Sequence, residues 1–246
     1  MTGRQLLRAI LAQAGTELRL TLRRGESVLV TVIIPVTLLV FFASARILPE
    51  SGRSIGFLLT GTVALAVIST GLVSLGIATA YERYYGVLKR LGLTPFPRGA
   101  LVAAKILAVL GLEALQVGLL VAIAAAAYGW RPQGSVPLAL LCLLLGTAAF
   151  AGLGLALAGG LRAEATLGLA NGLFLFFLLM GDLYVPLDHI PAVLVPLARI
   201  LPAAALADVL RAALSPAVSL PVGSSVVLTI WAIGAPILAA RVFRWE

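Results

Sequence analysis

The chain reads YERYYGVLKRLGLTP from Tyr81 to Pro95, a short charged segment between two long apolar runs. Its apolar residues recur at helical spacing and predict one stripe, formed by Tyr84, Val87, Leu88 and Leu91. The opposite face holds Glu82, Arg83, Gly86, Lys89 and Arg90. Such a helix lies along a membrane surface with its polar side in water, where a soluble partner can bind it. Proline ends the helix at Thr94-Pro95.

The composition is that of a membrane protein. The 246 residues are 61% hydrophobic and only 11% charged, whereas soluble domains carry about 25% charged residues. The mean hydropathy is +1.09. A helix needs about 20 apolar residues to cross a bilayer. We therefore predict an all-α polytopic protein with six spans, at 28–46, 55–80, 100–128, 137–160, 165–183 and 222–242.

The net charge of +8 is sorted along the chain, which argues against nucleic acid as a partner. Alternate crossings divide the 18 basic residues into two sets. The larger set of 13 lies in the N-terminal segment, in 81–105, in 162–164 and at the C-terminus. The other five are Arg46, Arg53, Arg131, Arg199 and Arg211. Because basic residues collect on the cytoplasmic side, both termini are predicted to be cytoplasmic, next to anionic membrane lipids.

Two segments outside the spans have their own patterns. Residues 4–24 predict an amphipathic interface helix, with Glu17 on its apolar side. The start of the chain also resembles a signal peptide, but its apolar core is too long, which favours an uncleaved span. Residues 184–214 hold two apolar stretches between prolines, Ala192–Leu201 and Ala203–Leu214. Each is too short to span, so we expect an extracellular re-entrant pair, or helices lying flat on the membrane.

Three of the polar residues inside predicted spans are candidates for a role in structure or function. For Glu113, a structural contact with a neighbouring helix is favoured over substrate contact or proton relay. Lys105 is expected to extend its ammonium to the cytoplasmic surface. Asn171 is expected to form a hydrogen bond across helices. Beyond the fifth span, Asp182, Asp188 and His189 are expected to be solvated loop residues.

The sequence contains none of the common catalytic motifs. It has no G-x-x-x-x-G-K-[ST] phosphate loop, no H-E-x-x-H, no G-x-S-x-G and no Cys/His cluster. Cys142 and His189 are single, so no disulfide within the chain and no metal site are expected. We predict that the chain is not an enzyme and binds no cofactor, and that any ATP is hydrolysed by another polypeptide.

These features resemble the type-2 ABC transporter permeases, the membrane subunits of bacterial ABC exporters. The stretch from Glu82 to Leu91, followed by Thr94-Pro95, is similar to the family pattern E-R-x-x-G-x-L-x-x-L…T-P. Gly181 to Pro186, with the later prolines and Arg211, is similar to G-x-x-x-P…P…P…R. The six spans and the N-terminal helix extend the likeness over the whole chain.

The resemblance implies roles for both segments. Residues 81–95 would be the coupling helix that docks on a cytoplasmic ATPase, through Glu82, Arg83, Tyr84, Gly86, Leu88, Lys89, Arg90, Thr94 and Pro95. Residues 184–214 would gate the exit. The residues expected to form this outer gate are Asp182, just before the segment, and Tyr184, Pro186, Pro191, Pro202 and Arg211 within it. One departure is that Ala203-Ala204-Ala205 follows Pro202, where the family often has an aromatic residue.

The resemblance also implies partners and a location. Two permeases, identical or paralogous, would lie in the inner membrane of a bacterium and pair with two ATPases. The ATPases would bind ATP and Mg. An amphipathic drug, a lipid or a glycan would suit the apolar walls. The alternatives are a proton- or ion-coupled secondary transporter using Glu113, an intramembrane enzyme, and a subunit of a maturation or signalling complex.

Overall fold

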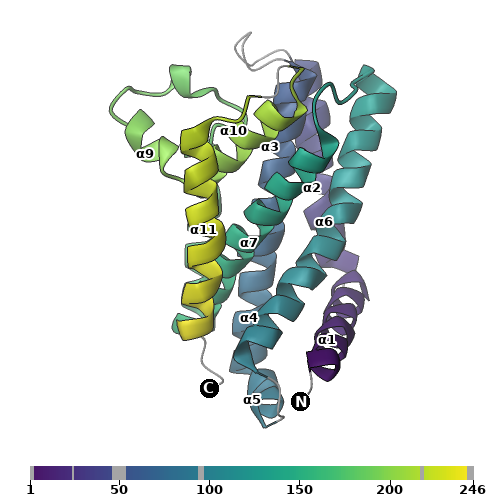
Figure 1. The fold of residues 1–246 in the computed structure, drawn as a ribbon, viewed down its shortest axis with the longest axis vertical. Coiled ribbons are helices and arrows are strands. Elements are labelled where there is room, and N and C mark those ends of the chain that lie inside the picture. Colours follow the sequence, from purple (N-terminus) through teal and green to yellow (C-terminus); the bar gives the residue numbers. More distant parts are fainter. Residues whose placement is uncertain (1–2, 24, 46–53, 94–96, 217–218, 243–246) are drawn as a thin grey trace.

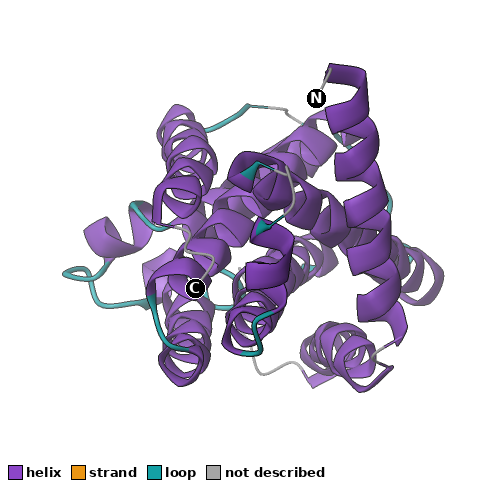
Figure 2. Cartoon of the chain, turned by 90° about the horizontal axis from the view of Figure 1, so that it is seen from below, coloured by secondary structure: helices purple, strands orange, loops and turns teal. Residues whose placement is uncertain are grey.

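The computed structural model describes residues 3–23, 25–45, 54–93, 97–216 and 219–242. The described residues form helices joined by loops, with no strand among them (Figure 2). In chain order the helices are α1 (Gly3–Arg23), α2 (Gly25–Ala45), α3 (Ile55–Val67), η2 (Ile68–Ser74), α4 (Leu75–Tyr84), α5 (Val87–Gly92), α6 (Arg98–Tyr128), α7 (Val136–Gly160), α8 (Ala163–Met180), η3 (Leu187–His189), α9 (Val195–Arg199), α10 (Pro202–Leu214) and α11 (Val222–Val242).

The all-α, polytopic prediction is confirmed. Within the described residues, five helices are long and apolar enough to cross a membrane: Ile55–Tyr84, Gly99–Tyr128, Val136–Gly160, Ala163–Met180 and Val222–Val242. The span predicted over 28–46 falls on α2, whose described apolar stretch is Thr31–Ser44. The total of six spans therefore stays a prediction.

The bundle has two distinct ends (Figure 1). Helix α5 lies at one end, where α1 begins and α11 finishes, and α9 and α10 lie at the other. We call these the α5 end and the α10 end. Viewed from the α5 end, α1 is seen from its side while α2 is seen nearly end-on, so α1 lies across the bundle (Figure 2). Leu18 of α1 packs on Gly111 of α6, and Leu7 and Leu11 are exposed.

The second apolar helix is longer than the predicted 55–80. It runs without interruption from Ile55 to Tyr84, and its middle seven residues, Ile68–Ser74, form a π-helix. Such π-segments are rare and often occur at functional sites. Here Thr70 of the segment donates a hydrogen bond of 3.0 Å to Gln116 of α6.

Helix α7 is the central element, packed on α11, α4, η2 and α10. Its small residues let neighbouring backbones approach closely, as their density in the sequence predicts. A Cβ at Gly152 would fall 2.5 Å from the backbone nitrogen of Pro236 in α11. A Cβ at Gly154 would fall 2.5 Å from the carbonyl oxygen of Gly71 in the π-segment. Two helices therefore contact α7 at positions where only glycine fits.

The segment after α8 forms two main helices of unequal length, and whether they re-enter the membrane stays a prediction. Helix α8 ends at Met180 rather than near residue 183, because Gly181 and the left-handed Asp182 (φ 55°) turn the chain. The stretch 192–201 forms only the five-residue α9. Helix α10 has 13 residues and does not lie flat on the surface, because nine of them are buried among α3, α7, α8 and α11.

We predict that Gly154→Val lowers the free energy of unfolding by about 1–3 kcal/mol, because valine must push α7 away from the π-segment. Gly168→Val on α8 is the matched control, since nothing lies within 4 Å of a Cβ there. Thermal unfolding of both variants in detergent checks the difference. Equal melting temperatures would contradict the close packing of α7.

Candidate functional site

A buried lysine joins three helices at the α5 end. Lys105 of α6 is 1% exposed, and its Nζ lies 3.0 Å from Oε1 of Glu17 in α1 and 2.7 Å from Oε2 of Glu82 in α4. The prediction that Lys105 reaches the surface is therefore wrong, because two carboxylates meet it inside the protein. The same contact accounts for Glu17 on the apolar side of α1.

This cluster is sensitive to the loss of any one member. Two carboxylates share one ammonium, and both Glu side chains are less than one-fifth exposed. Removing one partner of a buried ion pair leaves an uncompensated charge and costs about 3–5 kcal/mol. The cluster therefore fixes α1 and α4 against α6.

Arg83, next to Glu82, also points into the protein. Its Nη1 donates a 2.6 Å hydrogen bond to the carbonyl oxygen of Gly159, and its Nη2 donates to that of Leu161. These carbonyls lie at the end of α7, where a cation is favoured by the helix dipole. The predicted role of Arg83 on the exposed polar face is therefore corrected: its guanidinium holds α4 to α7.

The segment 81–95 is not one amphipathic helix. Helix α4 ends at Tyr84, Gly86 is left-handed (φ 74°), and α5 begins at Val87 in a new direction. The predicted single stripe is broken as a result. Leu88 is buried beside Leu101 and Leu155, whereas Tyr84 is 66% exposed. Thr94 and Pro95 lie outside the described residues.

The tip of the α5 end is the exposed part of this segment. Tyr84 and Tyr85 form an edge-to-face pair with ring centroids 5.2 Å apart, and Tyr85 is 69% exposed. Lys89 and Arg90 are exposed on α5. The exposed tip is therefore aromatic and basic. The helices that carry it are held to the bundle by Leu88, by Arg83 and by the cluster of Lys105 with Glu17 and Glu82.

Inside the bundle, Glu113 contacts a neighbouring helix, as the sequence predicted. Its Oε2 is hydrogen-bonded to Oγ1 of Thr147 in α7, and that hydroxyl is also 2.9 Å from the carbonyl oxygen of Leu143. In both contacts the Thr147 hydroxyl is the donor. The Oε1 of Glu113 is buried with no partner in the described part of the chain.

Gln116, rather than Asn171, forms the hydrogen bonds across helices. Asn171 is exposed and donates to the carbonyl oxygen of Leu167 in its own helix. The described residues thus show no bond from Asn171 across helices, contrary to the prediction. Gln116 instead accepts from Thr70 and donates 3.1 Å to the carbonyl oxygen of Thr31, which joins α6 to η2 and α2. A glutamine within a long apolar run was the available signal.

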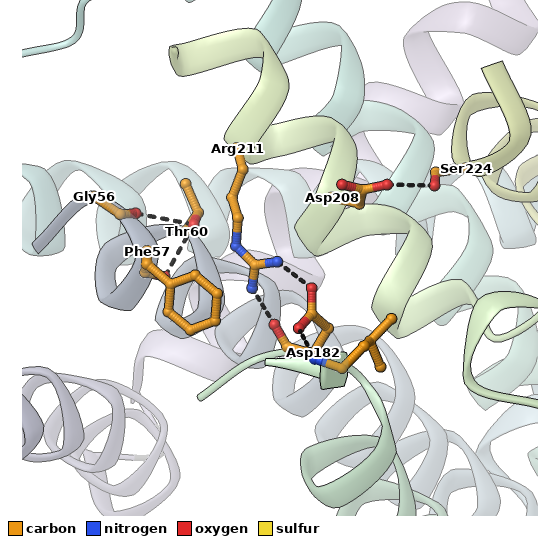
Figure 3. Close-up of polar contacts among 8 residues, drawn as sticks. Gly56, Phe57, Thr60, Asp182, Asp208, Arg211 and Ser224 are labelled. Carbon is orange, nitrogen blue, oxygen red and sulfur yellow. Dashed lines mark hydrogen bonds and ion pairs between the residues drawn. The ribbon is translucent and has the colours of Figure 1, made fainter. Parts of the chain in front are cut away.

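At the α10 end, Asp182 and Arg211 form a half-buried ion pair (Figure 3). Arg211 Nη1 donates to Asp182 Oδ2, and Nη2 donates to the carbonyl oxygen of the same residue. The guanidinium carbon lies 3.9 Å from the centre of the Phe57 ring in α3, a cation–π contact. Asp182 also accepts a 3.1 Å bond from the backbone of Leu187.

The expectation that Asp182 is solvated is therefore wrong. Burial raises the pKa of its carboxyl, although the Arg211 guanidinium opposes that effect. Asp188 and His189 are exposed, as expected, with His189 Nδ1 2.8 Å from Asp188 Oδ1. The pair with Arg211 was missed because 29 residues separate the partners.

The remaining predicted gate residues are structural elements of the same end. Tyr184 is buried, with its hydroxyl 3.0 Å from that of Thr62 in α3, and burial raises its pKa to about 12. Pro186 precedes η3, Pro191 precedes the turn before α9, and Pro202 is the first residue of α10. Together they direct the chain from α8 into α10.

Among the described residues there is no group of three or more His, Cys, Asp or Glu side chains that could hold a metal ion. The arrangement instead has an exposed tip at one end, a polar cluster behind it, and an ion pair at the opposite end. Nothing in these contacts resembles an arrangement of acid, base and nucleophile. The bundle is that of a multi-pass membrane component with an exposed aromatic and basic tip.

Comparison with known proteins defines the class. The model of the ABC-2 type transporter family matches residues 8–215, well over half of the chain. The chain therefore belongs to the ABC-2 type transporter family and is a transport permease of an ABC transporter, a system that works with an ATPase partner.

One relative is similar over most of both chains. It is "Putative transport permease YvfS" of Bacillus subtilis (strain 168), 23% identical over 200 residues, which cover 77% of this chain and 79% of the relative.

We predict that Lys105→Met lowers the free energy of unfolding by about 3–5 kcal/mol, because Glu17 and Glu82 are left without a cation. The triple variant Lys105→Met, Glu17→Gln, Glu82→Gln should regain most of that loss. Arg90→Met, at an exposed position on α5, is the control. A thermal melt of Lys105→Met that matches wild type would disprove the role of the cluster.

Arg211→Lys should lower the free energy of unfolding by about 1.5–3 kcal/mol, although it keeps the charge, because lysine cannot donate the paired bonds and also stack on Phe57. The exposed Arg199→Lys serves as the control. Thermal unfolding in detergent measures both, and an unchanged melting temperature for Arg211→Lys would rule out a clamp at Arg211.

Proposed function

We propose that this chain is the membrane subunit of an ATP-driven exporter and that its α5 end faces the cytoplasm of a bacterium. The observation that carries the proposal is the exposed tip of Tyr84, Tyr85, Lys89 and Arg90 on a fixed base. Family membership supports an ATPase partner at this place. ATP and Mg would bind to that partner, and this chain would bind neither.

The contacts behind the tip suggest how force would enter the bundle. The end of α4 is held by Glu82 to Lys105, and therefore to α6 and α1. It is held by Arg83 to the end of α7. A displacement of the tip when the ATPase closes would thus move several helices together, as a rigid body. A second permease, identical or paralogous, would complete the pathway.

The exposed side chains of the bundle indicate the chemical class of the transported substrate. Exposed side chains on α7 and α8 are mostly apolar, such as Leu140, Leu144, Leu175 and Leu179. A pathway with such walls suits an amphipathic drug, a lipid or a glycan-type substrate, moved outward.

A secondary transporter using Glu113 is the alternative, favoured by the unpartnered Oε1 of that side chain. It is weakened by the burial of Glu113, which is 3% exposed and hydrogen-bonded to Thr147. A proton carrier needs access to both sides of the membrane, and the pocket-lining residues at the α5 end do not include Glu113.

We predict that the tagged chain, purified in mild detergent from its host, retains a stoichiometric subunit with a phosphate-loop motif. The double variant Lys89→Glu, Arg90→Glu should lose that subunit, because it reverses the charge of the tip and leaves Arg83 and the Lys105 cluster unsubstituted. Arg4→Glu, Arg8→Glu on α1 is the matched control. Mass spectrometry of the bound proteins is the readout.

Two outcomes would contradict the proposal. A wild-type chain that purifies alone, where a known ABC complex survives, would favour the secondary transporter. An ATPase that stays bound to the double variant would place the docking surface elsewhere.

A further inference from the structure

Two clefts adjoin at the α10 end of the bundle. The larger, about 530 Å³, is lined by Phe57, Tyr128, Trp130, Arg131, Gln133 and Arg211, among others. The smaller, about 130 Å³, lies between α3, α6, α7 and α10 and has an apolar lining apart from Thr60. Thr60, Trp130 and Leu214 line both clefts, so the two are neighbours. Thr60, which lines both clefts, is drawn in Figure 3 with Phe57 and Arg211 of the larger cleft.

Among the described residues, the larger cleft carries an unmatched positive charge. The described part of its lining includes two arginines and no acidic residue. Asp182 matches the charge of Arg211. Arg131 is exposed, and the described part of the chain gives its guanidinium no ion pair or hydrogen bond. The cleft therefore suits an anionic group, with Trp130 and Tyr128 as the aromatic residues typical of a membrane interface.

The loop that carries Arg131 is held in place. Helix α6 ends at the left-handed Gly129 (φ 65°), and the Trp130 backbone N–H donates to the carbonyl oxygen of Ala124. At the other end of the loop, the Ser135 N–H donates a 2.7 Å bond to the carbonyl oxygen of Ala213 in α10. Arg131 thus stands on a loop that is fixed to both α6 and α10.

The smaller cleft is a slot that opens sideways. Val136 and Leu140 of α7 line it and are 47% and 55% exposed, whereas Ala139 and Leu210 are buried at its wall. Thr60 adds no free donor, because its hydroxyl is hydrogen-bonded to the carbonyl oxygens of Gly56 and Phe57. An apolar slot on the outside of a membrane bundle faces acyl chains.

We propose that the two clefts together bind one anionic phospholipid of the surrounding bilayer. Its phosphate would lie at Arg131, beside Trp130 and Gln133, and one acyl chain would occupy the slot along Val136 and Leu140. A bilayer lipid fits better than cargo because the slot opens on the side of the helices and lies within a single chain. Lipid binding at this site does not require an ATPase. A negative result for the lipid site would therefore not contradict the exporter proposal.

Native mass spectrometry of the purified complex tests the site, with phosphatidylglycerol and phosphatidylcholine of identical acyl chains as probes. We expect one phosphatidylglycerol per chain to bind in preference to phosphatidylcholine. Arg131→Ala should weaken phosphatidylglycerol binding about fivefold and phosphatidylcholine binding less, because the choline group already neutralises the phosphate of phosphatidylcholine. Val136→Trp, which fills the mouth of the slot, should weaken both lipids.

The matched controls are Arg199→Ala and Leu144→Trp, exposed positions that line neither cleft, and both should bind as wild type does. Equal binding of the two lipids by wild type, or an unchanged preference in Arg131→Ala, would overturn the site. Release of the bound lipid on adding ATP and Mg would identify it as cargo and overturn the assignment to a resident lipid.

Discussion

The ammonium of Lys105 is the contact on which the α5 end depends. A buried charge is tolerated only when it is paired, and here one cation is shared by Glu17 and Glu82 from two other helices. The pairing decides where α1 lies, which way the end of α4 faces, and therefore how the exposed tip is presented. Arg83 adds α7 to the same assembly through the carbonyl oxygens of Gly159 and Leu161.

Close packing of helices connects the α5 end to the α10 end. Glycines of α7 bring its backbone against η2 and α11, and Gly146 of α7 accommodates the side chain of Leu206 in α10. Helix α10 is in turn clamped by Arg211 to Asp182 and Phe57, and Asp208 accepts a 2.5 Å bond from Ser224 in α11. The chain of contacts from the α5 end to the α10 end therefore passes through α7 rather than along a single polar path.

The sequence predicts local features well and long-range polar pairs poorly. Apolar runs set most helix bounds, because length and hydropathy are properties of one segment, as α7 and α11 show. The contact of Glu113 followed from the high cost of an isolated polar group in a membrane. The partner of Lys105 could not be predicted, because 88 residues separate it from Glu17, which by itself looked like an interruption of an apolar face. The break at Gly86 was missed because a helical wheel assumes one continuous helix.

The π-segment Ile68–Ser74 has a consequence for the register of the long helix from Ile55 to Tyr84. A π-turn holds more residues per turn than an α-turn, so the residues after it are rotated relative to an unbroken helix, by about 100° for each extra residue. Glu82 meets Lys105 in that shifted phase. The faces of the helix before and after the π-segment therefore do not follow one continuous helical wheel. A one-residue deletion near Thr70 would rotate the half that contains Glu82 relative to the first half, while leaving the composition of that half intact.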